Sequence, residues 1–399
     1  MLIKRRHFLQ QTSLAAAGTL LIPKFLQGFH RQYPFQTRGK VLVVIQLSGG
    51  NDGLNTIVPF RNDIYYQTRP KLALQPSQVM ALNDEGGLHP ALAFLKTCYQ
   101  NGELAILNEV GYPNPDRSHF RSMDIWHSAS ASNEYVHTGW LGRFLDAACA
   151  GCEAPTQVLE LDDVLSLALK GEKHKGIAFQ DPRQLYTTSK SPAFEALAIH
   201  HHAGEDPLAD YLYRTLADTL NSAELIMEAS RKAHTQPAYP DTQLGKNLKT
   251  IASLITSDIN TSVYYASHGS FDTHINQQMQ QNRLFTELNN ALDAFVTDLK
   301  KQNRFKDVVI MTFSEFGRRV SQNASGGTDH GTANNMFIIG GGLKKPGFFN
   351  PLPTLQDLKD GDLQHKIDFR DVYWTMVENC LNASPEHILK GAFQNLGFV

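Results

Sequence analysis

The sequence predicts an α/β fold, a three-layer sandwich in which a mostly parallel central sheet lies between helical layers. Two observations support this prediction. Runs of β-branched and other apolar residues alternate along the chain with stretches of helical spacing, as they do in layered α/β folds. The first run, Lys40 to Leu47, is apolar at nearly every position and stops at a Ser-Gly-Gly sequence, which is typical of a central strand buried on both faces.

The other elements are predicted in the same way. Further strands are expected at 104–107, 261–267, 307–313 and 335–340, and helices at 88–100, 276–302 and 370–381. In the longest of these helical stretches, apolar residues recur at intervals of three and four, which is the spacing of one helix face. At 399 residues with 42% hydrophobic residues, the chain is long enough to bury a sizeable core.

The middle of the chain, from about 130 to 260, does not show this alternation and is predicted to be a mainly helical insertion. Its features are helical patterns and polar loops, at 206–231, 244–255, 170–191 and 200–202. The last of these is a run of three histidines, which indicates either a solvated loop or a metal contact. We therefore expect one α/β domain at 38–399 that carries this insertion.

Composition and charge exclude some classes of function. The net charge is −2, so the chain lacks the basic footprint of a nucleic-acid-binding protein. No apolar run after residue 30 reaches the roughly 18–20 residues that span a bilayer, so we expect no stable transmembrane span. Sixteen histidines justify a search for a metal site, because histidine is the commonest neutral metal ligand.

The first thirty residues have the architecture of an export signal. A basic start containing Arg5 and Arg6 precedes a short apolar stretch from Leu14 to Ile22. The paired arginines, followed by Phe8 and Leu9, resemble the twin-arginine signal, which the twin-arginine export machinery reads. The alternative is an N-terminal amphipathic helix. The signal predicts a periplasmic or secreted protein.

The four cysteines receive no catalytic role. Cys149 and Cys152 form a CxxC motif, but the chain has no second CxxC, so a zinc ribbon is unsupported. A disulfide in an oxidising compartment and ordinary packing both remain open for Cys98, Cys149, Cys152 and Cys380.

Polar segments follow the predicted strands, at the edge where ligands bind in open α/β sheets. In the first segment, 48–55, glycines allow a sharp turn, and Asp52 offers a carboxylate to a metal ion, or the segment is a turn held by Asx hydrogen bonds. In the second, 114–121, Ser118 lies at an expected helix N-terminus, where it is either a nucleophile or simply the N-cap.

Two later segments add histidines and charged residues. Asp272 and His274 are two residues apart after a strand, so in an extended loop they can converge on one ion. Glu315 directly follows a buried strand. Carboxylates are seldom buried for packing alone, so this position indicates a functional carboxylate. Arg318 has the planar fork that clamps anions, and His330 lies in a glycine-rich loop before the next strand. The alternative for these last residues is a surface ion pair and a flexible loop.

Together, the four segments place carboxylates, histidines, a serine and an arginine at several strand ends. This is the constellation expected of metal-assisted attack on an anionic ester. The glycine loop lacks the GxGxxG pattern of dinucleotide-binding folds, and the chain contains neither a phosphate loop ending in GKS or GKT nor a GxSxG nucleophile elbow.

With these motifs, the chain resembles the export-tagged bacterial proteins of domain of unknown function 1501, a family that looks related to the alkaline phosphatase and sulfatase superfamily. The matching segments are 44–55, 118–120, 271–274, 312–318 and 328–334. The resemblance implies an alkaline phosphatase-like central sheet, divalent metal ions and a nucleophile at Ser118. It implies metal ligands at Asp52, Asp272, His274, Glu315 and His330.

The remaining roles follow from the same resemblance. Arg318 or Asn51 would orient the anion, and His119 and His268 are expected at the substrate or as ligands that complete the metal site. Phe316 follows Glu315 where the superfamily has a histidine, so the site has lost one expected ligand. Nitrogen and oxygen ligands fit a divalent ion of zinc, manganese or iron, with zinc the first choice.

The sequence therefore predicts a periplasmic or secreted metal-dependent hydrolase of phosphate or sulfate esters. Its substrate would be a small anionic ester or a sulfated or phosphorylated glycan. The alternative is a non-catalytic glycan- or protein-binding or assembly protein on the same fold, which the lost histidine favours. A third interpretation is a metal-bound carbohydrate-processing enzyme of another reaction type.

Overall fold

The computed structural model describes residues 40–148, 155–192, 207–232, 237–257 and 259–399. The expected export signal with Arg5 and Arg6, the histidine run at 200–202, and Cys149 and Cys152 lie outside these residues. Within them, no helix is long and apolar enough to cross a membrane.

A central sheet of nine strands, counted over the described residues, organises the fold. Its order is β11-β5-β10-β9-β1-β8-β6-β7, and β14 also pairs with β5. The strands are β1 (Val41–Leu47), β5 (Leu104–Gly111), β6 (Val158–Leu161), β7 (Ile177–Ala178), β8 (Val263–His268), β9 (Val308–Phe313), β10 (Asn334–Gly340), β11 (Gly347–Phe348) and β14 (Ile367–Asp368). Two smaller sheets hold β2 (Ile57–Val58), β3 (Met80–Ala81) and β4 (Gly87–Leu88), and β12 (Leu358–Lys359) and β13 (Asp362–Leu363).

The central sheet is mostly parallel, as predicted. β1 lies at its middle and pairs in parallel with β8 on one side and β9 on the other, with Val44 opposite Tyr265 and Met311. The single antiparallel member among the described strands of this sheet is β10, which runs opposite to both β9 and β5. The start of β10 therefore lies at the edge where β1, β8 and β9 end.

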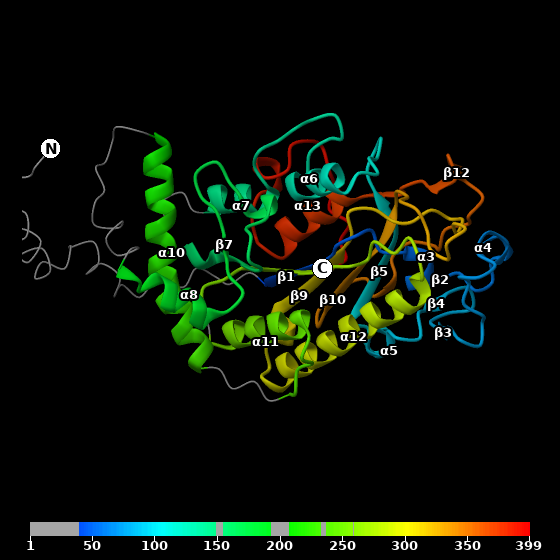
Figure 1. Cartoon of the computed structure of the whole chain (residues 1–399), viewed down its shortest axis with the longest axis horizontal. Helices are drawn as coiled ribbons and strands as arrows, with labels where there is room; N and C mark the ends of the chain where they lie inside the picture. The colour runs from blue at the N-terminus through cyan, green and yellow to red at the C-terminus, as the bar shows by residue number, and fades with distance from the viewer. Residues whose placement is uncertain (1–39, 149–154, 193–206, 233–236, 258) are drawn as a thin grey trace, which may run out of the picture. The chain divides into compact units, whose positions relative to one another are not determined.

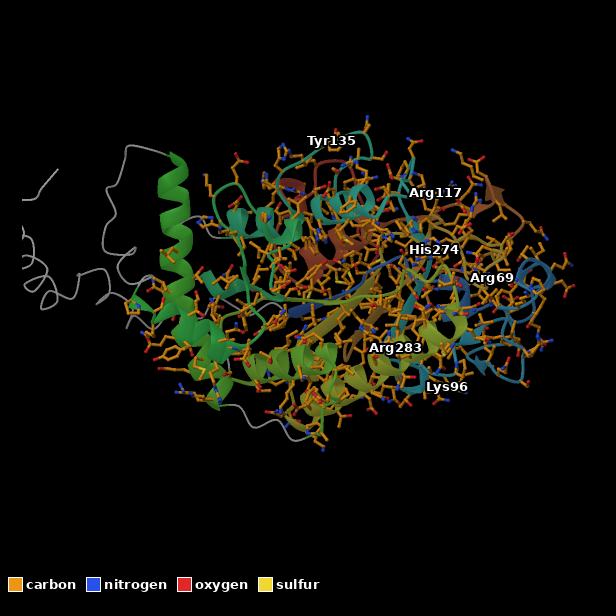
Figure 2. All side chains as sticks on the ribbon, in the orientation of Figure 1. Arg69, Lys96, Arg117, Tyr135, His274 and Arg283 are labelled. Atoms are coloured by element: carbon orange, nitrogen blue, oxygen red, sulfur yellow. The ribbon has the colours of Figure 1, made fainter. Side chains whose placement is uncertain are left out.

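Helices cover both faces of this sheet, which confirms the predicted three-layer α/β class (Figure 1). Alternate residues of β1 point to opposite faces, so Val43 and Ile45 belong to one core and Leu42 and Val44 to the other. Side chains fill the space between the sheet and the helices that cover it (Figure 2).

Different helices pack the two cores. The first core is packed by α5 (Ala93–Gln100), α11 (Gln243–Thr256) and α12 (Gln277–Lys301). The second is packed by α6 (His119–Ser128), α7 (Trp140–Ala148) and α13 (Phe369–Asn379). The other helices are α3 (Gly53–Thr56), α4 (Asp63–Thr68), α8 (Pro182–Ser189) and α10 (Pro207–Lys232).

The middle segment differs from its prediction in two respects. It contains the expected helices α10 and α11, but it also supplies β6 and β7, and β6 pairs in parallel with β8. The segment therefore extends the central sheet. The polar loop expected at 170–191 contains helix α8, which Asp181 caps and Pro182 begins, a local signal that the sequence does carry.

One helix begins later than expected. The helical pattern placed at 88–100 starts only at Ala93, because Leu88 pairs with Ile57 and Met80 in the small sheet. Pro90 also disfavours a helical conformation at His89.

Two of the cysteines lie within the described residues. Cys98 and Cys380 are both buried and free. Burial raises the pKa of each thiol to about 12, so neither is a thiolate at neutral pH. Of the two alternatives that the sequence left open, these two cysteines therefore follow ordinary packing.

Glu160 on β6 is a buried acid with a consequence for stability. It is 2% exposed, and its carboxylate accepts a hydrogen bond from the Ser166 amide. Burial raises the pKa of this carboxyl from 4.5 to about 7, against the opposing effect of the Ser166 hydrogen bond. The folded protein thus binds one more proton than the unfolded chain between these pH values. The associated stability is fully present below about pH 4.5 and is lost as the pH rises through about 7.

We expect Glu160→Gln to flatten this pH dependence. Relative to the wild type, the variant should gain about 3 kcal/mol between pH 4.5 and 8, on the order of the shift in pKa. Denaturant unfolding of both proteins at a series of pH values measures it. If the free energy of unfolding changed with pH equally in the two proteins, Glu160 would have an ordinary pKa in the folded state.

Candidate metal centre

Loops from several strands meet at the edge of the sheet where the parallel strands end. They follow β1, β8 and β9 and precede β10, and the start of α6 joins them. The turn after β1 needs glycine at two positions, since Gly49 and Gly50 have φ of +118° and +75°. A Cβ atom on Gly49 would lie 2.5 Å from the Asp272 amide nitrogen. The glycines thus allow this loop to pack directly against the loop that carries Asp272.

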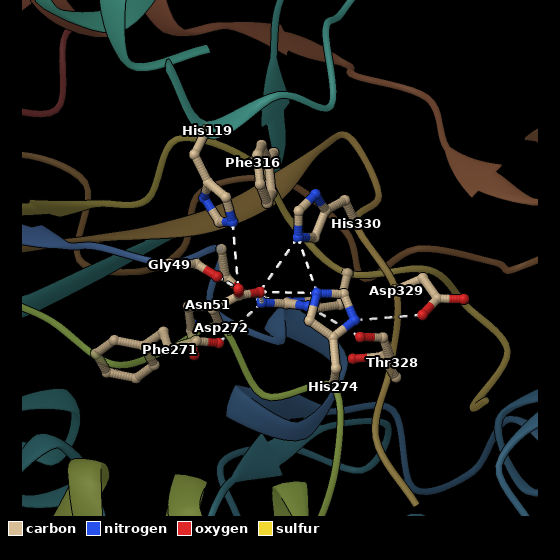
Figure 3. A network of polar contacts seen from close by, with 12 residues as sticks. Gly49, Asn51, His119, Phe271, Asp272, His274, Phe316, Thr328, Asp329 and His330 are labelled. Carbon is tan, nitrogen blue, oxygen red and sulfur yellow. Dashed lines mark hydrogen bonds and ion pairs between the residues drawn. The ribbon is translucent and has the colours of Figure 1, made fainter. Parts of the chain in front are cut away.

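Three histidines converge on the carboxylate of Asp272 (Figure 3). The His274 and His330 Nε2 atoms lie 2.9 and 3.1 Å from Asp272 Oδ1, and they are 3.0 Å from each other. The His119 Nε2 atom lies 3.5 Å from Asp272 Oδ2. His119, Asp272 and His330 are the histidine, cysteine or acidic residues that could together hold one ion within the described chain.

The other ring nitrogen of each histidine faces an oxygen atom. Nδ1 of His119 lies 2.8 Å from Glu315 Oε1, Nδ1 of His330 lies 2.8 Å from the Arg117 carbonyl oxygen, and Nδ1 of His274 lies 3.3 Å from Asp329 Oδ1. These oxygens accept, so each Nδ1 carries the proton and donates it. In the neutral rings, every Nε2 then presents a lone pair toward Asp272, which is the arrangement of metal-ligating histidines.

This donor set fits a metal ion. The buried His119 Nε2 atom has no hydrogen-bond partner, which is costly for a polar atom unless a cation or another group satisfies it. Ligands at about 2.0–2.1 Å from zinc in a tetrahedron are separated by about 3.3 Å. The His274 and His119 Nε2 atoms lie 2.9 and 3.5 Å from the Asp272 oxygens, on either side of that value, and the ligand atoms of His119, Asp272 and His330 all lie within 4.8 Å of one another. His119, Asp272 and His330 could hold the ion, and His274 lies within the same reach.

Charge stabilises the ionised form of Asp272. Burial opposes ionisation, but the hydrogen bond and positive charge of Arg318, together with the contacts of His330 and His274, outweigh it and lower the pKa of this carboxyl to about 2. The hydrogen bond to Glu315 raises the pKa of His119, and partial burial acts in the opposite direction. Asp272 is therefore a carboxylate at neutral pH, as a metal ligand must be.

Glu315 supports the cluster from behind rather than joining it. It is 1% exposed, and its Oε1 atom accepts hydrogen bonds from the Gly49 amide and from His119 Nδ1, each at 2.8 Å. The carboxylate predicted as a metal ligand thus lies on the far side of the His119 ring from Nε2. Here it fixes the tautomer and orientation of His119.

Arg318 holds three loops together and positions Asp272. Its buried guanidinium donates to the carbonyl oxygens of Gly49, Gly50, Phe271 and Thr328 and, at 2.7 Å, to Asp272 Oδ1. The side chain is fully buried. The arginine expected to clamp a substrate anion is therefore committed to the protein itself.

Asp52 is placed in a different network. Its buried carboxylate pairs with Arg69 at 2.6 Å, caps α3 through the Leu54 amide at 3.2 Å, and accepts from Gln277. Arg69, labelled in Figure 2, also reaches Asn55 and two carbonyl oxygens of the chain directly after Arg318. The carboxylate that the sequence predicted as a metal ligand is therefore paired with an arginine. It lies outside the group of residues around Asp272.

The remaining predicted residues are distributed around the cluster. Ser118 is the N-cap residue of α6, but its hydroxyl makes no capping hydrogen bond. Asn51 is buried, donates to Thr56 and leaves its Oδ1 without a partner. His268 is buried at the end of β8 and bonds through Nε2 to the Leu284 carbonyl oxygen, so the structure does not bring it to Asp272.

Phe316 stands where the family resemblance led us to expect a histidine. It is buried, and its ring centroid lies 4.9 Å from that of His119 and 4.7 Å from that of His330. A hydrophobic ring packed against both imidazoles restricts their orientation without adding a ligand. The sequence indicates either a substrate contact or a metal ligand at His119, and the structure places its Nε2 atom beside Asp272.

We expect Glu315→Gln to weaken metal binding about 10- to 100-fold, the usual cost of altering a residue that orients a ligating histidine. The amide keeps the size and one oxygen acceptor but removes the charge behind His119. Isothermal titration with zinc measures the effect. Glu103→Gln, at a surface ion pair with Lys300, is the matched control and should bind zinc as the wild type does.

The comparisons with known proteins identify the family. The family described as "Protein of unknown function (DUF1501)" matches residues 102–382, well over half of the 399 residues. The chain belongs to the DUF1501 family. The match includes Ser118 and every member of the cluster around Asp272, whereas Asp52 lies outside it. A search of curated proteins finds no match.

Solved structures similar to this DUF1501 chain share little sequence with it. The lipoteichoic acid synthase LtaP from Listeria monocytogenes is 10% identical, with 90% of this chain and 75% of that chain covered and a TM-score of 0.40. The PsFucS1 sulfatase from Pseudoalteromonas sp. is 12% identical, with 86% and 67% covered and a TM-score of 0.38. The phosphonate monoester hydrolase SpPMH from Silicibacter pomeroyi is 8% identical, with 89% and 77% covered and a TM-score of 0.39.

Proposed function

We propose that this DUF1501 protein is a metal-dependent hydrolase of phosphate or sulfate esters that acts in the periplasm or outside the cell. The observation that carries the proposal is the convergence of three histidine Nε2 atoms on Asp272, with each Nδ1 held by an oxygen. This partly exposed, oriented donor set lies at the carboxyl edge of the parallel strands, where such folds bind ligands. Export through the twin-arginine machinery is part of the proposal and rests on Arg5 and Arg6.

The cluster residues would hold a divalent ion. These residues are Asp272, His119, His274 and His330, and zinc suits such a set of imidazoles and one carboxylate. When bound, the ion would supply positive charge that polarises the ester and lowers the pKa of a nearby hydroxyl.

Residues behind the cluster would keep it in the ligating form. Glu315 and Asp329 accept the Nδ1 protons of His119 and His274 and so keep both rings in the ligating tautomer. Arg318 keeps Asp272 ionised and in place through its hydrogen bond at 2.7 Å.

Ser118 is the proposed nucleophile. It is exposed, it directly precedes His119, and its hydroxyl makes no capping hydrogen bond, while Asp116 Oδ1 accepts from its amide at 2.7 Å. The Ser118 Oγ atom would attack phosphorus or sulfur while the ester oxygen leaves with a proton. Water would then hydrolyse the seryl ester and regenerate the hydroxyl.

Arg117 replaces Arg318 as the proposed contact for the substrate anion. Its carbonyl oxygen accepts from His330, and its guanidinium is 41% exposed beside the buried carboxylate of Asp362. Arg319 pairs with the same carboxylate at 3.2 Å and is 37% exposed. Two guanidiniums sharing one carboxylate leave a net positive charge, which favours an anionic ester.

We expect Ser118→Ala to lower kcat by at least about 1,000-fold, the scale at which nucleophile substitutions act, and to leave zinc affinity unchanged. The variant removes one exposed hydroxyl and no described hydrogen bond. Turnover of p-nitrophenyl phosphate and p-nitrophenyl sulfate by zinc-loaded protein measures it. Activity that survives in the variant would exclude Ser118 as the nucleophile.

A non-catalytic binding role is the second candidate, and two observations favour it. Arg69 neutralises Asp52 and Phe316 replaces a histidine, so two ligands that a second metal ion would use are missing. A binding protein would hold one structural ion and turn over neither ester. Metal content and turnover on the same sample separate the two candidates.

A further inference from the structure

A hollow opens at the same edge of the sheet, beside the ends of β6 and β8. Its volume is about 220 Å³, roughly the share of seven water molecules in the liquid. Its lining comes from both the middle segment and the core of the fold. The polar lining residues used below are Asp162, Gln180, Gln243, Asn247, Ser267 and Glu287.

The lining offers donors and acceptors in a fixed arrangement. Asp162 accepts from the Ser267 hydroxyl at 2.7 Å, and Asn247 donates to the Leu161 carbonyl oxygen at 2.9 Å. Gln243 donates to Asn247 at 2.9 Å, which leaves its own oxygen available. The hollow therefore presents carboxylate and amide oxygens as acceptors and amide groups as donors, among them that of Gln180.

This chemistry selects among ligand classes. Two carboxylates, Asp162 and Glu287, disfavour an anion, and Glu287 already pairs with Arg283 at 3.0 Å, which also weakens attraction for a cation. Within the described chain, the residues grouped to hold a metal ion are around Asp272 and not here. Hydroxyl groups both donate and accept, so a neutral ligand rich in hydroxyls matches the lining on both counts.

We propose that this hollow binds one neutral sugar unit of the substrate, which makes the substrate a phosphate or sulfate ester of a glycan. This inference rests on the proposed ester hydrolysis. Gly269 lines the hollow and Asp272 lies in the metal cluster, and three residues of chain span at most about 11 Å. A short glycan can therefore place one sugar in the hollow and an ester on a neighbouring sugar at the cluster.

Gly269 permits a test that fills the hollow without straining the fold. A Cβ atom there would meet no atom within 4 Å, and the residue is outside the positive-φ glycines. Gly269→Leu should therefore fold and occupy the space of the sugar. Gly342→Leu is the matched control, since its Cβ would meet only the Lys40 ammonium group, at 3.8 Å, away from the residues that line the hollow.

The probes are glucose, galactose and N-acetylglucosamine, each titrated into the full protein and followed by saturation-transfer NMR. We expect at least one to bind with a Kd of about 1–10 mM, the range of a single small ligand with few contacts. Gly269→Leu should weaken that binding at least tenfold, and Gln243→Ala should weaken it several-fold. Gly342→Leu should leave it within twofold of the wild type.

The outcome is separable from that of the proposed hydrolysis. Asp272→Asn should lose metal and keep the sugar, because neutral sugar binding does not use the cluster. The inference is overturned if none of the three sugars binds, if binding survives in Gly269→Leu, or if protonated glucosamine binds where the neutral sugars do not. Failure of ester turnover alone, with sugar binding intact, would refute the hydrolase and not the sugar site.

Discussion

Asp272→Asn is expected to abolish stoichiometric metal binding, with affinity for zinc lowered by at least about 100-fold, more than the effect of altering an orienting residue. Asp272 is the residue that contacts His119, His274 and His330 together. The amide keeps its size but removes the charge that the cation needs, and it places a donor group among three histidines. Elemental analysis of protein prepared with excess zinc, followed by calorimetric titration, measures the loss.

Asp329→Asn provides the matched control for this change. Asp329 contacts His274 on its Nδ1 side only, at 3.3 Å, and its side chain is more exposed than that of Asp272. The same acid-to-amide change there should cost about tenfold in zinc affinity, the lower end of the range for a residue that orients a ligating histidine. A wild type that takes up no zinc, or an Asp272→Asn protein that keeps one ion per chain, would eliminate the metal centre as described.

The second large effect is expected at Arg69. The Asp52–Arg69 pair is buried, with side-chain exposures of 1% and 0%. Arg69→Met would leave an uncompensated carboxylate in the interior, which costs about 3–5 kcal/mol of the free energy of unfolding. Guanidinium chloride unfolding monitored by tryptophan fluorescence measures the change.

The double variant Asp52→Asn with Arg69→Met tests the cause of that loss. It removes the buried charge together with its partner, so most of the lost stability should return, apart from the hydrogen bonds that Arg69 donates to carbonyl oxygens. Arg283→Met, which breaks an exposed pair with Glu287, should barely move the unfolding midpoint. A double variant as unstable as Arg69→Met alone would assign the loss to packing rather than to charge.

The sequence predicted the central elements because their signals are local. β1, β8, β9 and β10 are mostly apolar runs, and α12 shows a clear helical period. The short β6 and β7 were missed for the opposite reason. β6 has four residues and β7 has two, too few for a periodic pattern that distinguishes a strand from a loop. Their place in the sheet depends on the pairing of β6 with β8, which local sequence does not show.

The sequence predicted which loops meet at the site. It did not predict what each side chain in those loops contacts. The strand ends placed the right segments at one edge, but an aspartate or arginine after a strand gives the same pattern whether it faces a ligand or a neighbouring loop. Asp52 meets Arg69, seventeen positions later, and Arg318 meets carbonyl oxygens on three separate loops. These partners are brought together by the tertiary fold, so no spacing in the sequence reveals them.

The reversed direction of β10 has a consequence for how such a site can change. β9 and β10 are adjacent in the sheet, so the chain between them leaves and returns at one edge, with Arg318 bridged to His330. This single excursion carries Glu315, Phe316, Arg318, Asp329 and His330. A replacement of the whole excursion would exchange a ligand, its neighbours and their supports at once while every strand keeps its partners. The segment between β9 and β10 can therefore be exchanged as one unit. The reaction at this site can change while the central sheet keeps its fold.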